Sequence, residues 1–258
     1  MSVDARLHVN PTGALLDAAR DCELQVFSEW YGNTAAEFAD EYGPYDDASV
    51  FLALEDAAGD VVAVMRLIAP VGTAGLKALN DIGHEPWGVD GPRAARAAGL
   101  DLASTWEIAT LGSRRQQGSA RIRNSLALYH GFGVLARVNA MSAFVAILDE
   151  RVRRLLDMTG LRTHPLPGTR TAPYLGSDAS TPVYGVNARL ADQQRREHPD
   201  AFALVAMGSG LDGIDVPPDD AFRLFGRDRV AATSWITPDV VGRAASSPLV
   251  RVGQESRR

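Results

Sequence analysis

The sequence predicts an α/β (α+β) fold, in which helices flank a mixed, mostly antiparallel central sheet to form α-β-α layers. Two strand-like runs, VFLAL (50–54) and VVAVMRLI (61–68), are joined by EDAAGD, which indicates an antiparallel hairpin. A third strand-like run at 104–112 precedes a helical stretch and then a continuous apolar run at 141–148. This strand–helix–strand order predicts a right-handed parallel crossover.

The remaining elements follow from local patterns. Apolar residues at helical spacing predict a helix over 14–30, and the same spacing predicts the crossover helix over 121–140. Between the first helix and the hairpin, the acidic stretch EFADEYGPYDD (37–47) is broken by glycine and proline. Frequent glycine, proline and alanine over 71–104 predict a loop with some helix.

The helix predicted over 149–161 has the clearest start and stop signals in the chain. Asp149 suits its N-cap, and Gly160 suits a left-handed C-terminal end. Its predicted apolar stripe consists of Val152, Leu155, Leu156 and Met158. A late strand is predicted over 181–190, followed by short helices at 217–225 and 238–245.

The length of 258 residues suits one large domain, predicted over 1–190. Residues 191–258 are predicted to form a C-terminal extension that packs on or extends this domain, with the last residues disordered. Hydrophobic residues make up 46% of the chain and charged residues 22%, which is typical of globular proteins.

Several function classes are disfavoured by composition. The formal net charge of −6 argues against nucleic-acid and membrane-surface partners, which require a basic face. Cys22 is the single cysteine and the five histidines lack ligand spacing, so no metal site is expected. The N-terminus lacks signal-peptide features and no apolar run reaches the length of a membrane span, which predicts a cytoplasmic protein.

Positive charge gathers in EIATLGSRRQQGSARIRNS (107–125), between a predicted strand and a predicted helix. Arg115–Ala120 fits the pattern (Gln/Arg)-x-x-Gly-x-(Gly/Ala). Free N–H groups and the dipole of a helix N-terminus favour a bound anion, and arginine side chains add contacts to phosphate. The segment therefore predicts a phosphate site, with a solvated loop as the alternative.

Two charged residues, Arg66 and Glu107, interrupt otherwise apolar strands. In a catalytic interpretation, Glu107 accepts a proton from a reacting amine and Arg66 orients it. In a structural interpretation, the two form an ion pair across the sheet or face solvent. The acidic stretch at 37–47 either holds a cationic or amine substrate or is a solvated loop, and Tyr129 is either a proton donor or a core aromatic residue.

The order of elements and the arginine-rich loop resemble the GNAT acyltransferase superfamily. Within it, the chain is most similar to autoinducer (acyl-homoserine-lactone) synthases and N-acyl amino acid synthases. The similar segments are LQVFSEW (24–30), EYGPYDDASVFLAL (41–54), VVAVMRLIAP (61–70), WEIATLGS (106–113), NSLALYHGFGVLARV (124–138) and AFVAILDERVRRLLDMTGL (143–161).

The resemblance implies an N-acyltransferase that moves an acyl group from a thioester to the amine of a small molecule or amino-acid derivative. The thioester, on coenzyme A or acyl carrier protein, is a cosubstrate, and no prosthetic group is implied. Glu107 and Arg66 match the family's strand carboxylate and strand arginine. The residues expected to bind the donor are Leu111, Gly112, Arg114, Arg115, Gln116, Gln117, Gly118, Ser119, Ala120 and Arg121.

The resemblance also assigns residues to substrate binding, namely Phe27, Trp30, Asp46, Asp47, Thr110 and Phe144. Glu23 stands where the family usually carries an arginine, and Ala109-Thr110 stands where it carries a Ser-Arg pair. These positions shape the acceptor side, so the resemblance does not carry S-adenosylmethionine over as the acceptor.

Two other functions compete with catalysis. One is a non-catalytic protein of the same fold that binds an acyl thioester, and the other is a module whose basic loop docks an acidic carrier protein. The expected partners are a small-molecule amine and, in the second case, acyl carrier protein, and the expected state is monomer or homodimer. The residues after 198 either cover the acyl pocket or make a subunit contact.

Overall fold

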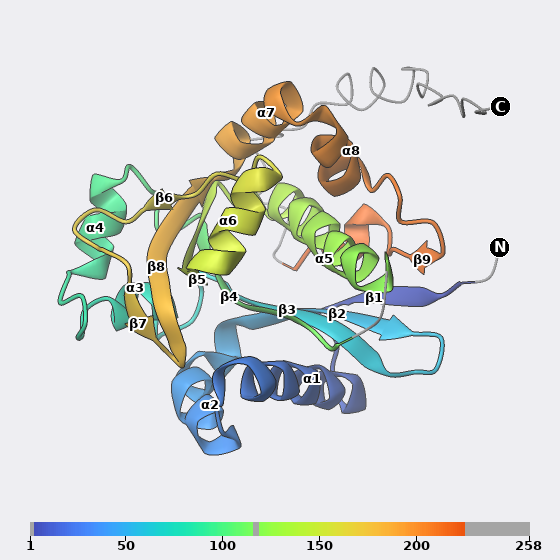
Figure 1. Cartoon of the computed structure of the whole chain (residues 1–258), viewed down its shortest axis with the longest axis horizontal. Coiled ribbons are helices and arrows are strands. Elements are labelled where there is room, and N and C mark those ends of the chain that lie inside the picture. The colour runs from blue at the N-terminus through green and yellow to red at the C-terminus, as the bar shows by residue number, and fades with distance from the viewer. Residues whose placement is uncertain (1–2, 116–118, 225–258) are drawn as a thin grey trace, which may run out of the picture.

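The computed structural model describes residues 3–115 and 119–224 of the chain. Helices pack on both faces of one open sheet (Figure 1). In the described residues the sheet has the strand order β6-β8-β5-β4-β3-β2-β1-β9, with β7 paired to β8. The strands are β1 (Ala5–Val9), β2 (Ser49–Asp56), β3 (Val61–Ile68), β4 (Thr105–Ser113), β5 (Ala143–Asp149), β6 (His164–Pro165), β7 (Ala172–Tyr174), β8 (Ser177–Val186) and β9 (Ile214–Asp215).

The sheet is mixed and mostly antiparallel, as predicted. Its parallel pairs in the described residues are β4 with β5 and β1 with β9. The parallel β4–β5 pair, joined by a long helix, confirms the predicted parallel crossover. The hairpin predicted at 50–68 is β2–β3.

The helices form a layer on each side of the sheet (Figure 1). They are α1 (Ala14–Tyr31), α2 (Ala35–Tyr42), α3 (Lys77–Asp81), α4 (Gly91–Ala97), α5 (Ser119–Val138), α6 (Glu150–Met158), α7 (Asn187–Glu197) and α8 (Pro199–Met207), with 3-10 helices η1 (Gly43–Ala48) and η2 (Asp219–Phe222). One apolar core cluster lies between the sheet and α5, and two others lie against α3–α4 and α1. None of the described helices is long and apolar enough to cross a membrane.

Four local expectations are corrected by the structure. The broken acidic stretch is largely α2, because Thr34 and Glu37 form a reciprocal capping box that starts a helix. The late strand ends at Val186, and α7 begins where the Asn187 amide donates to the Met141 carbonyl. Within 217–225, η2 is a 3-10 turn, and the helix predicted at 238–245 lies outside the described residues.

The fourth correction concerns α6. Asp149 caps it and Gly160 follows it with a positive φ of 78°, as predicted. Its predicted apolar stripe is not buried, however, since Leu155 is 52% exposed and Met158 is 70% exposed. Only one side of this helix faces the protein, and that side borders the cavity described below.

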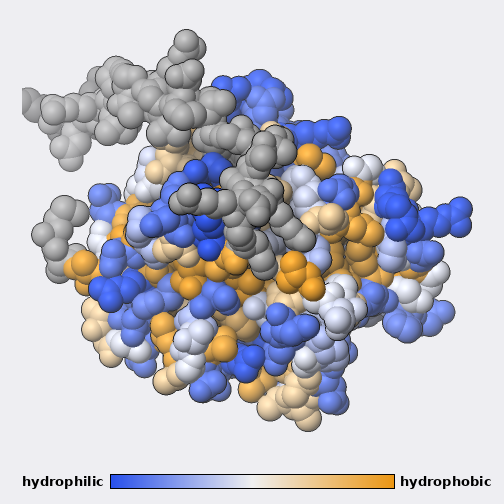
Figure 2. Space-filling view, turned by 180° about the vertical axis from the view of Figure 1, so that it is seen from behind, coloured by the Kyte–Doolittle hydropathy of each residue, from blue (hydrophilic) through white to orange (hydrophobic). Residues whose placement is uncertain are grey.

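Seen from behind, hydrophilic residues are spread over the surface and apolar surface lies among them (Figure 2).

The close crossing of α1 over β4 predicts a stability cost for a larger residue at Gly112. A Cβ atom there would lie 2.8 Å from Cγ1 of Val26 on α1. Because strand and helix must separate to admit a side chain, we expect Gly112→Val to lower the free energy of unfolding by about 1–3 kcal/mol. Urea denaturation measures this change.

Gly43→Ala serves as the control, since a Cβ atom at Gly43 meets nothing within 4 Å. Its φ of −52° also suits alanine. We expect a change within about 0.5 kcal/mol. Equal losses for the two variants would show that the α1–β4 contact tolerates expansion.

Candidate functional site

A cavity of about 170 Å³ lies where β4 and β5 part. The two strands pair at Thr105–Ala143, Trp106–Phe144 and Glu107–Val145. The β4 residues that line the cavity, from Ile108 to Leu111, directly follow the last of these pairs. The cavity therefore occupies a gap inside the sheet, at a place where the two strands no longer bond to each other.

Apolar side chains make up most of the cavity wall on the α5 side of the sheet. They come from the four helices α5, α6, α7 and α8 and from the strands, and they are Met65, Ile108, Leu111, Phe132, Phe144, Leu156, Leu190, Phe202 and Val205. The rings of Phe132 and Phe144 meet edge to face, with centroids 5.7 Å apart. Tyr129 also lines the wall, and burial raises its pKa to about 12. Such a wall suits a flexible apolar ligand.

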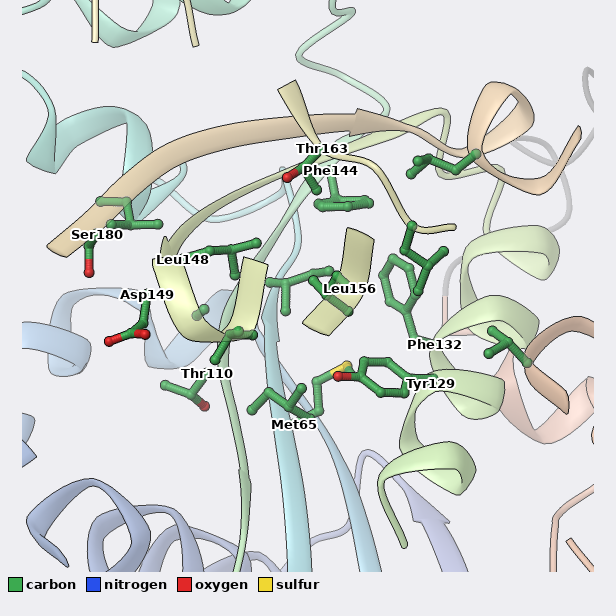
Figure 3. A pocket seen from close by; sticks show the side chains of 18 of the residues that line it. Met65, Thr110, Tyr129, Phe132, Phe144, Leu148, Asp149, Leu156, Thr163 and Ser180 are labelled. Atoms are coloured by element: carbon green, nitrogen blue, oxygen red, sulfur yellow. The ribbon is translucent and has the colours of Figure 1, made fainter. Parts of the chain in front are cut away.

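The opposite end of the cavity carries polar and aromatic groups. Phe27 and Tyr31 of α1, Tyr42 of α2 and Tyr174 of β7 line it. Figure 3 shows Asp149 and Ser180 on one side of the pocket and Phe132 and Tyr129 on the other. The hydrogen bonds of Arg151 hold the pKa of the Asp149 carboxyl down to about 2, so Asp149 stays ionised and paired with the Arg151 guanidinium. The cavity is thus apolar at one end and polar at the other.

A β-bulge places Ala109 at the cavity. Ile108 of β4 pairs with Leu67 of β3, and Thr110 pairs with Arg66, so Ala109 is an extra residue on β4. Ala109 and Thr110 both line the cavity. The bulge thus lies in the stretch of β4 that has left β5, where backbone groups on the gap side have no strand partner in β5.

Arg66 is buried and organises the polar side of the sheet. Its guanidinium donates to the Glu23 carboxylate, with the shortest contact at 2.6 Å, and to Asp46 at 3.4 Å. The Thr110 hydroxyl donates to the same Glu23 carboxylate. The guanidinium also lies 4.7 Å from the ring centroids of Tyr42 and Phe51. Of the alternatives left open by the sequence, an ion pair between Arg66 and Glu107 does not form, because Glu23 is the partner of Arg66.

Glu107 lies on the same face but behind the cavity wall. Its carboxylate accepts a 2.8 Å hydrogen bond from the backbone N–H of Ala78, at the start of α3. Glu107 is 4% exposed and is not among the residues that line the cavity. Burial raises its pKa to about 8. Tyr42 does line the cavity, and its high pKa reflects burial first and then the charges of Glu23 and Glu107.

A second buried cation, Lys77, lies beside Glu107. Its ammonium is 2.5 Å from both Glu41 and Asp81, and it donates to the Tyr174 hydroxyl at 2.9 Å. Burial alone would lower the pKa of Lys77, but the two carboxylates more than offset this and raise it. Tyr174 in turn donates to Asp81, and these bonds hold its ring at the cavity wall.

The predicted phosphate loop is only partly described. Gln116, Gln117 and Gly118 lie outside the described residues, and of Ser119, Ala120 and Arg121 only the backbone is described, as the start of α5. Arg115 is exposed, 3.6 Å from Glu29 and over the Trp30 ring at 5.5 Å. The helix start after the loop agrees with the sequence pattern, and the phosphate site itself stays a prediction.

The structure brings some of the residues predicted for catalysis, donor binding and substrate binding to the cavity and leaves others outside it. Phe27, Thr110, Leu111 and Phe144 line the cavity. Trp30, Asp46, Asp47, Arg66, Glu107 and Gly112 do not. Asp46 instead bonds to Arg66 and lies 3.2 Å from Arg20, and Gly112 packs on Val26.

Sequence reasoning allowed that residues after 198 cover the pocket, and α8 does line the cavity, but it did not predict the helices α7 and α8 or the tyrosines at the polar end. The α8 residues Phe202, Val205 and Ala206 recur at i, i+3 and i+4 after Pro199, which is a detectable helical signal. Tyr42 and Tyr174 offered no such signal, because nothing local indicates that two tyrosines 132 positions apart share one cavity.

The comparisons with solved structures support the fold. The chain matches FeeM, an N-acyl amino acid synthase from uncultured soil microbes, with a TM-score of 0.54 and 11% identity, over 73% of this chain and 93% of FeeM. It matches BjaI, a CoA-dependent acyl-homoserine lactone synthase solved with MTA, with a TM-score of 0.54 and 13% identity, over 85% of this chain and 96% of BjaI.

At these identities the matches show a shared GNAT-like fold, and the structural neighbours belong to the branch that the sequence resembles. No family model matches the sequence, and no curated protein does.

The buried Arg66–Glu23 pair predicts strong coupling between the two residues. Glu23→Leu leaves the guanidinium without its main partner, so we expect it to lower the free energy of unfolding by about 3–5 kcal/mol. Arg66→Met leaves the buried Glu23 carboxylate without the guanidinium, so we expect a loss of the same size. The double variant Glu23→Leu/Arg66→Met removes both charges, and we expect it to recover much of the loss.

Urea unfolding of the four proteins completes a double-mutant cycle. Additive losses, with the double variant less stable than either single variant, would contradict the buried pair.

Proposed function

We propose that this protein is an N-acyltransferase that moves an acyl group from a thioester to the amine of a small molecule. The observation that carries the proposal is the cavity through the gap between β4 and β5, apolar at one end and polar at the other. On a GNAT-like fold, this arrangement supports an acyl chain in one half and an amine in the other.

The donor is an acyl thioester on coenzyme A or on acyl carrier protein. Its chain lies along the apolar wall, and its thioester carbonyl lies at the Ala109 bulge, where N–H groups on the gap side of β4 polarise it. The phosphate-bearing arm leaves the cavity toward Arg114, Arg115 and the start of α5, whose N-terminus favours an anion.

The acceptor amine enters at the end lined by Phe27, Tyr31, Tyr42 and Tyr174. Behind this end, Arg20, Arg66 and Lys77 are matched by four carboxylates. Those carboxylates belong to Glu23, Glu41, Asp46 and Asp81. Each cation is thus paired within the protein, and the surplus of negative charge favours an amine over an anionic acceptor.

The reaction is a direct displacement. The neutral amine nitrogen forms a bond to the thioester carbon, the C–S bond breaks, and the thiolate leaves and takes up a proton. The nitrogen loses one proton, and we assign that proton to Glu107. Since Glu107 does not line the cavity, the proton reaches it through the Tyr42 hydroxyl or a water molecule.

Purified protein incubated with acyl-CoAs and acyl carrier proteins, together with a panel of amines, tests the proposal. Mass spectrometry is expected to detect N-acylated products and free thiol in equal amounts. Tight acyl-CoA binding without any product would instead support a non-catalytic acyl-thioester-binding protein. Binding of carrier protein that lacks its phosphopantetheine arm would support the docking function.

The role of Glu107 predicts a pH dependence. Its carboxyl accepts a proton only when ionised, so the rate is expected to rise with pH and level off above about 8. Glu107→Gln is expected to lower kcat by about 10²–10⁴-fold and to abolish that limb of the profile. An acceptor amine that is already uncharged at pH 6 ensures that only the protein titrates.

Glu107→Gln also separates catalysis from the capping of α3. The glutamine carbonyl still accepts the N–H of Ala78, so we expect an unchanged thermal midpoint. Glu107→Ala removes both the proton acceptor and the acceptor for the Ala78 N–H, so it is compared with Glu107→Gln in both assays. Wild-type turnover and a wild-type pH profile in Glu107→Gln would show that Glu107 is purely structural.

A further inference from the structure

Helix α8 contributes one of its faces to the cavity. Phe202, Val205 and Ala206 line it, and their i, i+3, i+4 spacing places them on one side of the helix. α8 packs against α5 and α7, whereas the polar end of the cavity is lined from α1, α2 and β7. Figure 1 shows α8 and α1 on opposite sides of the sheet. The helix thus closes the end of the cavity remote from the amine.

The position of α8 is held from both sides. The ring nitrogen Nδ1 of His130 on α5 donates to the Val205 carbonyl at 2.8 Å. Further along the chain, β9 pairs with β1, and the side chain of Phe222 is fully buried in the core cluster beneath α5. The Asn139 amide also donates to the Phe222 carbonyl at 2.8 Å. These anchors make α8 a fixed wall.

The size of the wall residues decides how much chain fits in front of them. Phe202 is 5% exposed and carries a large ring, whereas Ala206 is a small residue on the same lining face. A longer chain must displace the ring, and a bulkier residue at 206 must displace the chain. Protein interiors are close-packed, so neither change is absorbed without cost.

We propose that the α8 face formed by Phe202, Val205 and Ala206 sets the length of the acyl chain that this protein accepts. The inference rests on the proposed function, since it takes the occupant of the cavity to be an acyl chain. Each methylene that the wall excludes forfeits about fourfold in affinity, the equivalent of about 0.8 kcal/mol. Chain length is therefore selected by a segment that follows the β4–α5–β5 unit by some fifty residues.

The test uses the full-length protein and two ligand series, saturated acyl-CoAs and saturated free fatty acids from C4 to C16. Calorimetry measures binding for both series, and product formation measures kcat/KM for the acyl-CoAs. We expect Ala206→Phe to move the optimum at least two carbons shorter and Phe202→Ala to move it at least two carbons longer. Affinity for the wild-type optimum is expected to fall at least tenfold in Ala206→Phe.

Ala203→Phe is the matched control, because Ala203 lies on the same helix and does not line the cavity. We expect it to keep the wild-type optimum in both series. Thermal midpoints show whether each variant is folded. If Phe202→Ala fails to fold, the comparison of Ala206→Phe with Ala203→Phe decides alone.

The outcomes separate this inference from the proposed function. An absence of transfer alongside a shifted binding optimum would overturn the N-acyltransferase and leave the length-selecting wall supported. If Ala206→Phe and Phe202→Ala both keep the wild-type optimum, or if Ala203→Phe shifts it equally, the inference that α8 selects chain length is wrong. The proposed N-acyltransferase activity is not affected by that result. Failure of the wild type to bind any member of either series, together with no transfer from acyl carrier proteins in the turnover assay, would overturn both.

Discussion

The parting of β4 and β5 is the constraint on which the candidate site depends. The two strands pair over three residues each and then separate, while β4 stays bonded to β3 and β5 stays bonded to β8. Because each strand keeps its other neighbour, the sheet holds together around an internal gap. The cavity in this gap is lined by elements from both faces of the sheet.

The two faces differ because different elements cover them. On one face, apolar side chains of α5, α7 and α8 border the cavity. On the other, Arg66 gathers Glu23 of α1 and Asp46 of η1, and Thr110 of β4 joins the same Glu23 carboxylate. A buried guanidinium persists only where carboxylates and ring faces surround it. The same network therefore holds in place α1 and α2, which bring Phe27 and Tyr42 to the polar end.

Long elements with a regular sequence pattern could be predicted from the sequence. Short elements that form only through pairing with distant segments could not. The hairpin, β4, α5 and β5 have continuous periodic patterns, and all were confirmed within a few residues. β1 has five residues and β9 has two, and both exist through pairing with distant strands. The acidic stretch was misjudged because two residues, Thr34 and Glu37, were enough to start α2. In α6, Leu155 follows the helical period but faces outward, since no element within residues 3–115 and 119–224 covers it.

The sequence by itself determined which residue types occupy which elements. It placed a charge within each of two apolar strands, an arginine-rich loop before a helix, and a glutamate at position 23. Only the tertiary structure decided which charges meet. The bulge at Ala109 sets Thr110 opposite Arg66, and α1 brings Glu23 over the sheet from 43 positions away. The physical reason is that strand register and helix docking depend on contacts between distant segments, and local patterns carry no information about those contacts.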